Sequence, residues 1–280
     1  MRYIISIPLA LILVAAAQDS LDNDGILRCS TETSTLAINS SSLMKKRQNQ
    51  ALQPISIDLY MHFVASDNGA PKKLLRKAAK RQLNALNNAF RPSRISFTMR
   101  GVLFWNDAFH ATIQNNQELA SMIARYHRGD AKTLNLFVPN FPSKSLGIGA
   151  CVSFDNLFID QTVPLSSDGC FVSPTTLPGS ATARYNQGKS AVHEAGHWLG
   201  LLHTFEGGCD GQGDHIPDTP AQAKATYTCD ESQDTCPFSP GVDPIHNYMG
   251  YSYDYCMTEF TPKQTFTMHY IWHTFRTKSP

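Results

Sequence analysis

The segment at positions 193–203, HEAGHWLGLLH, limits the possible folds and chemistry of this chain more than any other. Its first two histidines, His193 and His197, are four residues apart, so a helix places both imidazoles on one face, about one turn apart. Two such rings can hold one metal ion. Glu194 follows the first of them, so its carboxylate can point at a water on the open side of the metal. The segment therefore predicts a helix that binds zinc.

The same segment predicts where that helix ends. His203 can reach the same ion only if the helix stops and the chain turns sharply, and Gly200 permits the turn because glycine takes positive φ without a Cβ clash. Three neutral histidines leave the fourth zinc position open to water, which is the arrangement of a catalytic site. The shorter HExxH pattern also occurs by chance, as two ordinary histidines on a helix, but the extended string is much rarer.

The N-terminus has the features of a secretory signal over residues 1–17. Arg2 supplies the positive end, a short apolar run covers Ile4–Val14, and Ala15–Ala17 is a small-residue cleavage site. The alternative, a membrane anchor, is disfavoured because the run is shorter than the ~20 apolar residues that span a bilayer. We therefore expect a secreted, extracellular protein.

Residues 18–47 are polar and end at the basic run Lys45–Arg47, a candidate processing site. We interpret this stretch as a pro-segment that precedes a catalytic domain at 48–280, and the alternative is a simple flexible tail. The formal net charge of +1 gives no reason to expect nucleic acid or a membrane as partner. No feature marks an oligomer interface, so we expect a monomer.

Hydrophobic periodicity predicts a sheet backed by helices. Strands are expected at 54–64, 95–104 and 133–138, with amphipathic helices at 72–90 and 117–127 between them. The lysines and arginines of the first helix are interpreted as an ordinary solvated face. Two short strands, 147–151 and 170–172, are expected at one sheet edge, where an extended peptide could add as a further strand. The zinc helix is expected at 189–201 and a last helix from 262 to about 276.

Seven cysteines in an exported chain make disulfides expected and leave one thiol over. Six lie in the second half and could form three bridges, of which Cys151–Cys170 would join the two short strands. Cys29 lies far from the other cysteines, near the N-terminus, so we expect it to be the one outside the three bridges.

A polar loop at 213–220 contains Asp214, Asp218 and Thr219. Oxygen ligands in a flexible loop suit calcium. From spacing alone the alternative is favoured, namely a polar turn in which the aspartates accept hydrogen bonds from local N–H groups.

The strings at 193–209, 213–220 and 247–251, together with Cys256-Met257 and 260–262, resemble the pappalysin family of metzincin zinc peptidases, in particular its small secreted members. The match is strong over about 190–265. Over 50–190 it is weaker and concerns mainly the order of the expected helices and strands. The resemblance implies an α+β metzincin fold. Its upper part, about 50–200, would hold a twisted mixed sheet with two helices. An irregular, disulfide-rich lower part with a C-terminal helix would cover about 201–280.

Carried over residue by residue, the resemblance assigns zinc to His193, His197 and His203 and makes Glu194 the general base. Two further roles are implied. Met249 would form the hydrophobic floor under the metal, and Tyr251 would stabilise the oxyanion.

The resemblance also implies the pairs Cys209–Cys236 and Cys229–Cys256, and it lends support to calcium in the loop of Asp214, Asp218 and Thr219. Arg28–Thr31 resembles a cysteine-switch motif in which the Cys29 thiolate would block the open zinc position, although Ser30 stands where glycine is expected. Tyr255 occupies the position that is acidic in family members that cut before basic residues, and Asp254 lies one place earlier, so the resemblance leaves the cleavage preference open.

These features predict a secreted zinc endopeptidase acting on proteins or peptides. A non-catalytic secreted zinc-binding module is a second possibility, but it would be expected to lack Glu194 or a histidine. A zinc amidase or esterase acting on non-protein substrates is a third possibility. The predicted edge strand argues against it, because such a strand would bind an extended peptide.

Overall fold

The computed structural model describes residues 29, 52–66, 70–140, 148–152 and 165–278. The predicted signal segment, and all of the predicted pro-segment except Cys29, lie outside this range. Among the described helices, none combines the length and apolar character that a membrane crossing requires.

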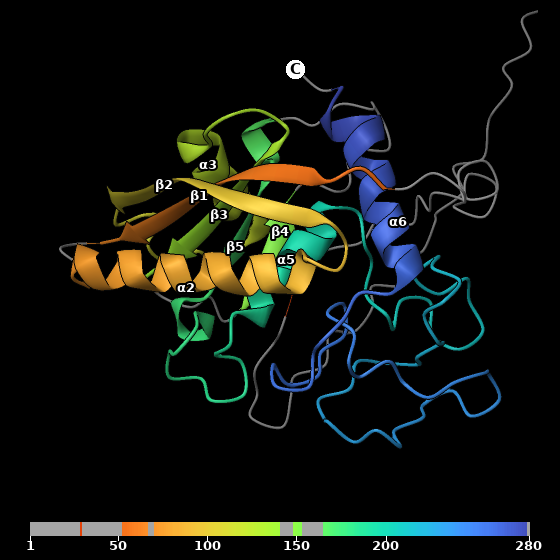
Figure 1. The fold of residues 1–280 in the computed structure, drawn as a ribbon. Helices are drawn as coiled ribbons and strands as arrows, with labels where there is room; N and C mark the ends of the chain where they lie inside the picture. The colour runs from red at the N-terminus through yellow and green to blue at the C-terminus, as the bar shows by residue number, and fades with distance from the viewer. Residues whose placement is uncertain (1–28, 30–51, 67–69, 141–147, 153–164, 279–280) are drawn as a thin grey trace, which may run out of the picture.

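One five-stranded sheet forms the centre of the fold, in the order β2-β1-β3-β5-β4 (Figure 1). Its strands are β1 (Ile55–Ala65), β2 (Ile95–Asn106), β3 (Thr133–Pro139), β4 (Gly149–Val152) and β5 (Gly169–Val172). Neighbouring strands are parallel except β4, which runs antiparallel to β5 at the sheet edge. The two short strands therefore form where the sequence predicts them, with β4 starting two residues and ending one residue later than expected.

Helices cover both faces of this sheet. α2 (Lys72–Phe90) and α5 (Lys189–Trp198) lie on one face and α3 (Asn116–Tyr126) on the other (Figure 1). Side chains alternate across the sheet with a period of two, so every second residue of β1 enters the core shared with α2 and α5. These residues are Ile55, Ile57, Leu59, Met61 and Phe63. The resemblance implied two helices in this part of the fold, and α3 is a third, formed where the apolar spacing predicted it.

The zinc helix α5 is buried along nearly its whole length and ends at Trp198, earlier than the predicted position 201. The reason is Gly200, whose φ of 97° lies in the left-handed region, where a helix cannot continue. A Cβ at Gly200 would also overlap the side chain of Ile271 in the C-terminal helix. The glycine thus turns the chain and lets the last helix pack close.

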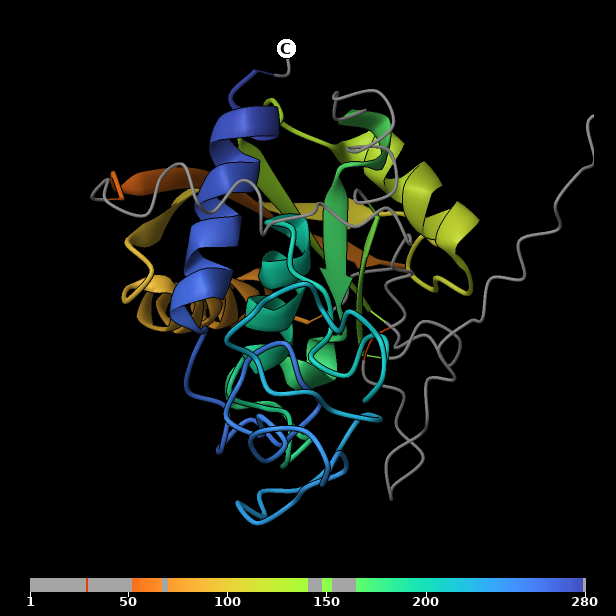
Figure 2. The ribbon, with the colours of Figure 1, turned by 90° about the vertical axis from the view of Figure 1, so that its right-hand side faces the viewer.

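Residues 201–261 are described throughout and contain no helix and no extended strand. The disulfides Cys209–Cys236 and Cys229–Cys256 cross-link them, which compensates for the lack of apolar runs. The chain then enters α6 (Pro262–Ile271) and its π-helical continuation η3 (Trp272–Arg276). Figure 2 shows α6 beside α5, with the irregular loops below both.

Candidate active site

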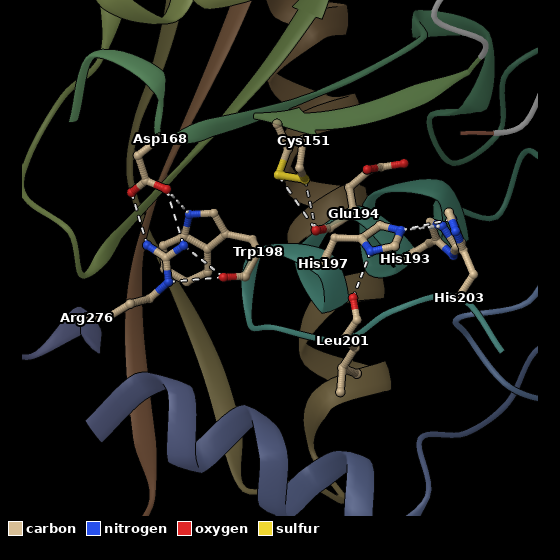
Figure 3. Close-up of a disulfide and its surroundings, with 10 residues drawn as sticks. Cys151, Asp168, His193, Glu194, His197, Trp198, Leu201, His203 and Arg276 are labelled. Carbon is tan, nitrogen blue, oxygen red and sulfur yellow. Dashed lines mark hydrogen bonds and ion pairs between the residues drawn. A yellow bond between two sulfur atoms is a disulfide. The ribbon is translucent and has the colours of Figure 1, made fainter. Parts of the chain in front are cut away.

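Three histidine side chains converge at the end of α5. The Nε2 atom of His197 lies 3.0 Å from that of His193 and 3.1 Å from that of His203. All three rings are buried and turned toward one another (Figure 3). The Gly200 turn is what brings His203 back to the helical pair, as the motif predicted.

Backbone carbonyls fix the tautomer of the two histidines on α5. His193 Nδ1 donates to the carbonyl of Tyr248 (2.7 Å), and His197 Nδ1 donates to that of Leu201 (2.8 Å). Because a carbonyl oxygen can only accept, both Nδ1 atoms carry the proton and each neutral ring directs an unprotonated Nε2 inward. Burial also lowers the pKa of His197 to about 4, so that ring is neutral at physiological pH.

This donor set fits zinc. Unprotonated nitrogens 3.0 and 3.1 Å apart repel one another unless a cation lies between them. Tetrahedral zinc with Zn–N bonds of about 2.0–2.1 Å separates its ligand nitrogens by about 3.3 Å. The side chains of His193, His197 and His203 are therefore already gathered to nearly the spacing that the ion requires.

Glu194 is buried, and its carboxylate lies against the backbone of the edge strand at Gly149. A Cβ at Gly149 would come within 2.9 Å of the Glu194 Cδ, so any larger residue there would displace the carboxylate from its present position. The Glu194 backbone oxygen lies 3.0 Å from the sulfur of Cys151, which is bridged to Cys170 (Figure 3). The disulfide therefore ties β4 and β5 together directly beside the glutamate.

The lower part supplies the other two residues predicted for the site. Met249 is fully buried, with its sulfur against the α5 backbone at Gly196. The Tyr251 hydroxyl lies 3.2 Å from Nε2 of His203 and donates to the Cys29 carbonyl (2.9 Å). The Tyr251 side chain thus lies at the histidine cluster, and Met249 packs against α5 at the residue before His197.

Cys29 joins the same cluster. Four potential ligand atoms, one each from Cys29, His193, His197 and His203, lie within 4.8 Å of one another. All four residues are buried. This is the only group of three or more such potential ligands among the described residues. A residue far from the motif in sequence therefore lies at the predicted metal position.

The predicted calcium loop is only partly assembled. Thr219 Oγ1 donates to Oδ1 of Asp214 (2.7 Å), whereas Asp218 accepts from Thr261 Oγ1 (2.6 Å) and from the Lys263 N–H (2.9 Å). Asp218 thereby stabilises the N-terminus of α6, a distant segment, and not the local N–H groups of the polar-turn alternative. Asp214 is buried, and its Oδ2 has no hydrogen-bond partner among the described residues.

The candidate specificity residue Tyr255 is 59% exposed. Its acidic neighbour Asp254 is buried and accepts hydrogen bonds from the backbone N–H groups of Gln187 (2.8 Å) and Lys189 (3.3 Å). Asp254 therefore stabilises the start of α5.

One cluster beside the site has no signal in the sequence. Arg276 and Asp168 form an ion pair at 3.0 Å with both side chains fully buried. Arg276 also donates to the backbone oxygen of Trp198 (2.8 and 3.0 Å) and to that of Ala131 (2.9 Å). The Trp198 indole N–H donates to Asp168 (2.9 Å) (Figure 3). This Arg276 cluster secures the end of α5 next to the ligand His197.

Comparisons with known proteins find metalloproteases. A family model described as "Pregnancy-associated plasma protein-A" matches residues 118–272. An extracellular metalloprotease of Pyricularia oryzae is 38% identical over 276 residues, covering 94% of this chain and 95% of that protein. One from Arthroderma otae is 41% identical over 224 residues, covering 79% of each. Mature mirolysin of Tannerella forsythia, solved with a cleaved peptide, has a similar fold with a TM-score of 0.67 at 23% identity, covering 80% of this chain and 95% of its own.

The sheet with its antiparallel edge is that of a metzincin fold, and the family model and the relatives make the chain a metalloprotease of that type. Within that class, the chain belongs to the Pregnancy-associated plasma protein-A, or pappalysin, family. It is a zinc metalloprotease, and its substrates are proteins or peptides.

Proposed function

We propose that the chain is a secreted endopeptidase in which His193, His197 and His203 hold the zinc and Glu194 is the general base. The convergence of the three Nε2 atoms beside the Glu194 carboxylate carries the proposal. When bound, zinc acidifies water and polarises a carbonyl group.

Glu194 takes the proton of the attacking water and passes it to the leaving amine nitrogen. Its place against Gly149, on a buried helix, limits the rotation of the carboxylate. The Tyr251 hydroxyl, next to His203, donates to the carbonyl oxygen as negative charge develops there. Met249 supports the imidazoles from below.

The edge strand β4 aligns the substrate peptide with the site. Among the described strands it pairs only with β5, so its other side is available to an extended peptide. A peptide added there would pass the Glu194 carboxylate at Gly149. This arrangement favours a peptide over a compact non-protein substrate.

Casein zymography with and without a zinc chelator tests the function. We expect a clearing band that the chelator abolishes and that added zinc restores. Casein cleavage that persists in the chelator, with the metal shown to be removed, would contradict the proposal.

For the whole chain we propose a signal segment at 1–17, a pro-segment at 18–47 and a monomeric catalytic domain at 48–280. The relatives that are named extracellular metalloproteases support export. N-terminal sequencing of the secreted product tests both boundaries.

Replacing Cys29 by alanine is expected to make the unprocessed chain active. The Cys29 thiolate lies with the three histidines and is a good zinc ligand, so it would block access of water to the metal. We expect unprocessed wild-type protein to be latent in a casein assay, the Cys29→Ala precursor to be active without cleavage near residue 47, and the control Ser30→Ala to stay latent. A latent Cys29→Ala precursor would refute the switch.

Calcium binding at Asp214 is expected to stabilise the lower part. Burial raises the pKa of Asp214 from 3.8 to about 7, so without a cation its ionisation lowers folding stability as pH rises from about 4 to about 7. Added calcium should therefore raise the melting temperature more at pH 8 than at pH 5 in the wild type. The effect should disappear in Asp214→Asn and persist in the exposed control Asp230→Asn. Equal calcium effects in all three proteins would exclude the site.

A further inference from the structure

Helix α2 carries an unusual concentration of positive charge. Its 19 residues include six of the chain's 24 lysines and arginines and no acidic residue. The six, all exposed, are Lys72, Lys73, Arg76, Lys77, Lys80 and Arg81. A chain with a formal net charge of only +1 thus places a quarter of its cations on one helix.

This arrangement works against the stability of the helix. Lys73 and Lys77, like Arg76 and Lys80, are neighbours four residues apart, where like charges repel. Cations in the first turn also oppose the helix dipole, and the N-cap residue Pro71 supplies no side-chain hydrogen bond. A face that served only solubility would mix charges of both signs.

None of the six cations forms an ion pair with a described carboxylate. Exposed cations elsewhere do so, such as Arg100 with Asp58 (2.8 Å) and Lys132 with Asp130 (2.9 Å). On α2, Lys72 and Arg76 instead lie over the ring of Phe104, at 5.6 and 5.0 Å from its centre.

A cavity of about 180 Å³ opens at the N-terminal end of α2, next to Lys72. It lies at the carboxyl ends of β1, β2 and β3. Its wall includes the rings of Phe63, Phe104 and Trp105 and the amides of Asn106 and Asn140. Aromatic rings stack on the apolar faces of sugar rings, amides hydrogen-bond their hydroxyl groups, and a lysine attracts an acidic substituent.

We propose that the basic face of α2 and this cavity bind an acidic polysaccharide, with one sugar in the cavity and the chain following the helix. Anionic lipid is a poorer fit, because the apolar side of α2 packs on the sheet and Leu74 is the only large hydrophobic residue that it exposes. α2 lies over the β2 side of the sheet, opposite the edge formed by β4 (Figure 1). A bound polysaccharide would therefore hold the enzyme without covering the edge proposed for the peptide.

Heparin and polygalacturonate, one sulfated and one carboxylated, are suitable probes of the purified secreted protein. We expect the wild type to bind at least one of them, with an affinity that falls steeply with salt. The quadruple variant Lys73→Gln, Arg76→Gln, Lys77→Gln, Lys80→Gln should lose about tenfold or more in affinity and show a shallower salt dependence. The variant Asn106→Ala, in the cavity wall, should weaken binding without changing the salt dependence.

The matched control makes the same change of charge at exposed sites outside α2, with Arg100→Gln, Lys132→Gln, Lys224→Gln and Lys278→Gln. It should retain the affinity within about twofold, and both quadruple variants should cleave casein as the wild type does. No binding of either polysaccharide near ~0.15 M salt, or equal losses in the two quadruple variants, would overturn the proposal. Tighter binding to vesicles containing phosphatidylserine or to DNA would assign the surface to another partner.

Discussion

Glu194→Ala is expected to retain bound zinc and lose peptide cleavage by about 10³-fold or more, since general acid–base catalysis alone contributes about 10²–10⁴-fold. The ligands His193, His197 and His203 stay in place, because their orientation depends on the carbonyls of Tyr248 and Leu201 and on the Gly200 turn. The variant loses only the proton transfer from the attacking water to the leaving amine, which is the one role assigned to the Glu194 carboxylate. Turnover of a quenched fluorescent peptide and the zinc content of the same sample measure both properties.

Glu206 provides the matched control. Its carboxylate lies 3.9 Å from Nδ1 of His203, on the side of the ring away from the nitrogen assigned to zinc. Glu206→Ala should therefore lose less activity than Glu194→Ala, through a looser His203 ring and weaker zinc binding, whereas Glu194→Gln, which preserves shape but cannot take a proton, should be as inactive as Glu194→Ala. Undiminished cleavage by zinc-loaded Glu194→Ala would remove the general base from the proposed mechanism.

The parts of the site that the sequence predicts are those that depend on residues close together in the chain. The i, i+4 histidines and the glycine turn act through backbone geometry within 193–203, so the motif alone places three ligands. The β-α-β-α-β layout follows from hydrophobic periodicity in the same way. The end of α5 was predicted three residues late, because the glycine turn begins at once after Trp198 and leaves no frayed last turn.

The parts that were not predicted depend on contacts between distant segments. The carbonyl of Tyr248, which orients His193, arrives from the lower part through a loop of no regular structure. Asp254 stabilises the start of α5 from a position 65 residues downstream of Lys189. Backbone carbonyls and capping carboxylates carry no residue-type signature, so no spacing rule identifies them.

Asp218 also shows that residue types alone do not determine the role of a side chain. It belongs to a loop with calcium-like composition, yet both its oxygens accept hydrogen bonds at the start of α6. The residue types fit either role. The contacts of Asp218 with Thr261 and Lys263, more than 40 residues later, could not be predicted from the loop itself, and calcium binding by the loop stays a prediction.

Arg276→Ala is expected to destabilise the protein by about 3–5 kcal/mol, the cost of leaving one member of a buried ion pair alone. Asp168 would be left without its ion-pair partner in a fully buried site, and the backbone oxygen of Trp198 would lose its arginine donors. Because Trp198 directly follows the ligand His197, the end of α5 should loosen as well. We therefore expect weaker zinc retention in a chelator competition, measured at a temperature where the variant is still folded.

Two comparisons separate this buried cluster from an ordinary charge pair. Arg100→Ala breaks the pair with Asp58, whose side chains are 54% and 40% exposed, and should cost only about 0–1 kcal/mol in urea unfolding. The double variant Arg276→Met, Asp168→Leu removes both buried charges together and should recover much of the stability lost in Arg276→Ala. The zinc affinity of the double variant should stay below that of the wild type, because methionine cannot donate to the Trp198 carbonyl. An Arg276→Ala protein no less stable than Arg100→Ala would show that the ion pair is not buried as described.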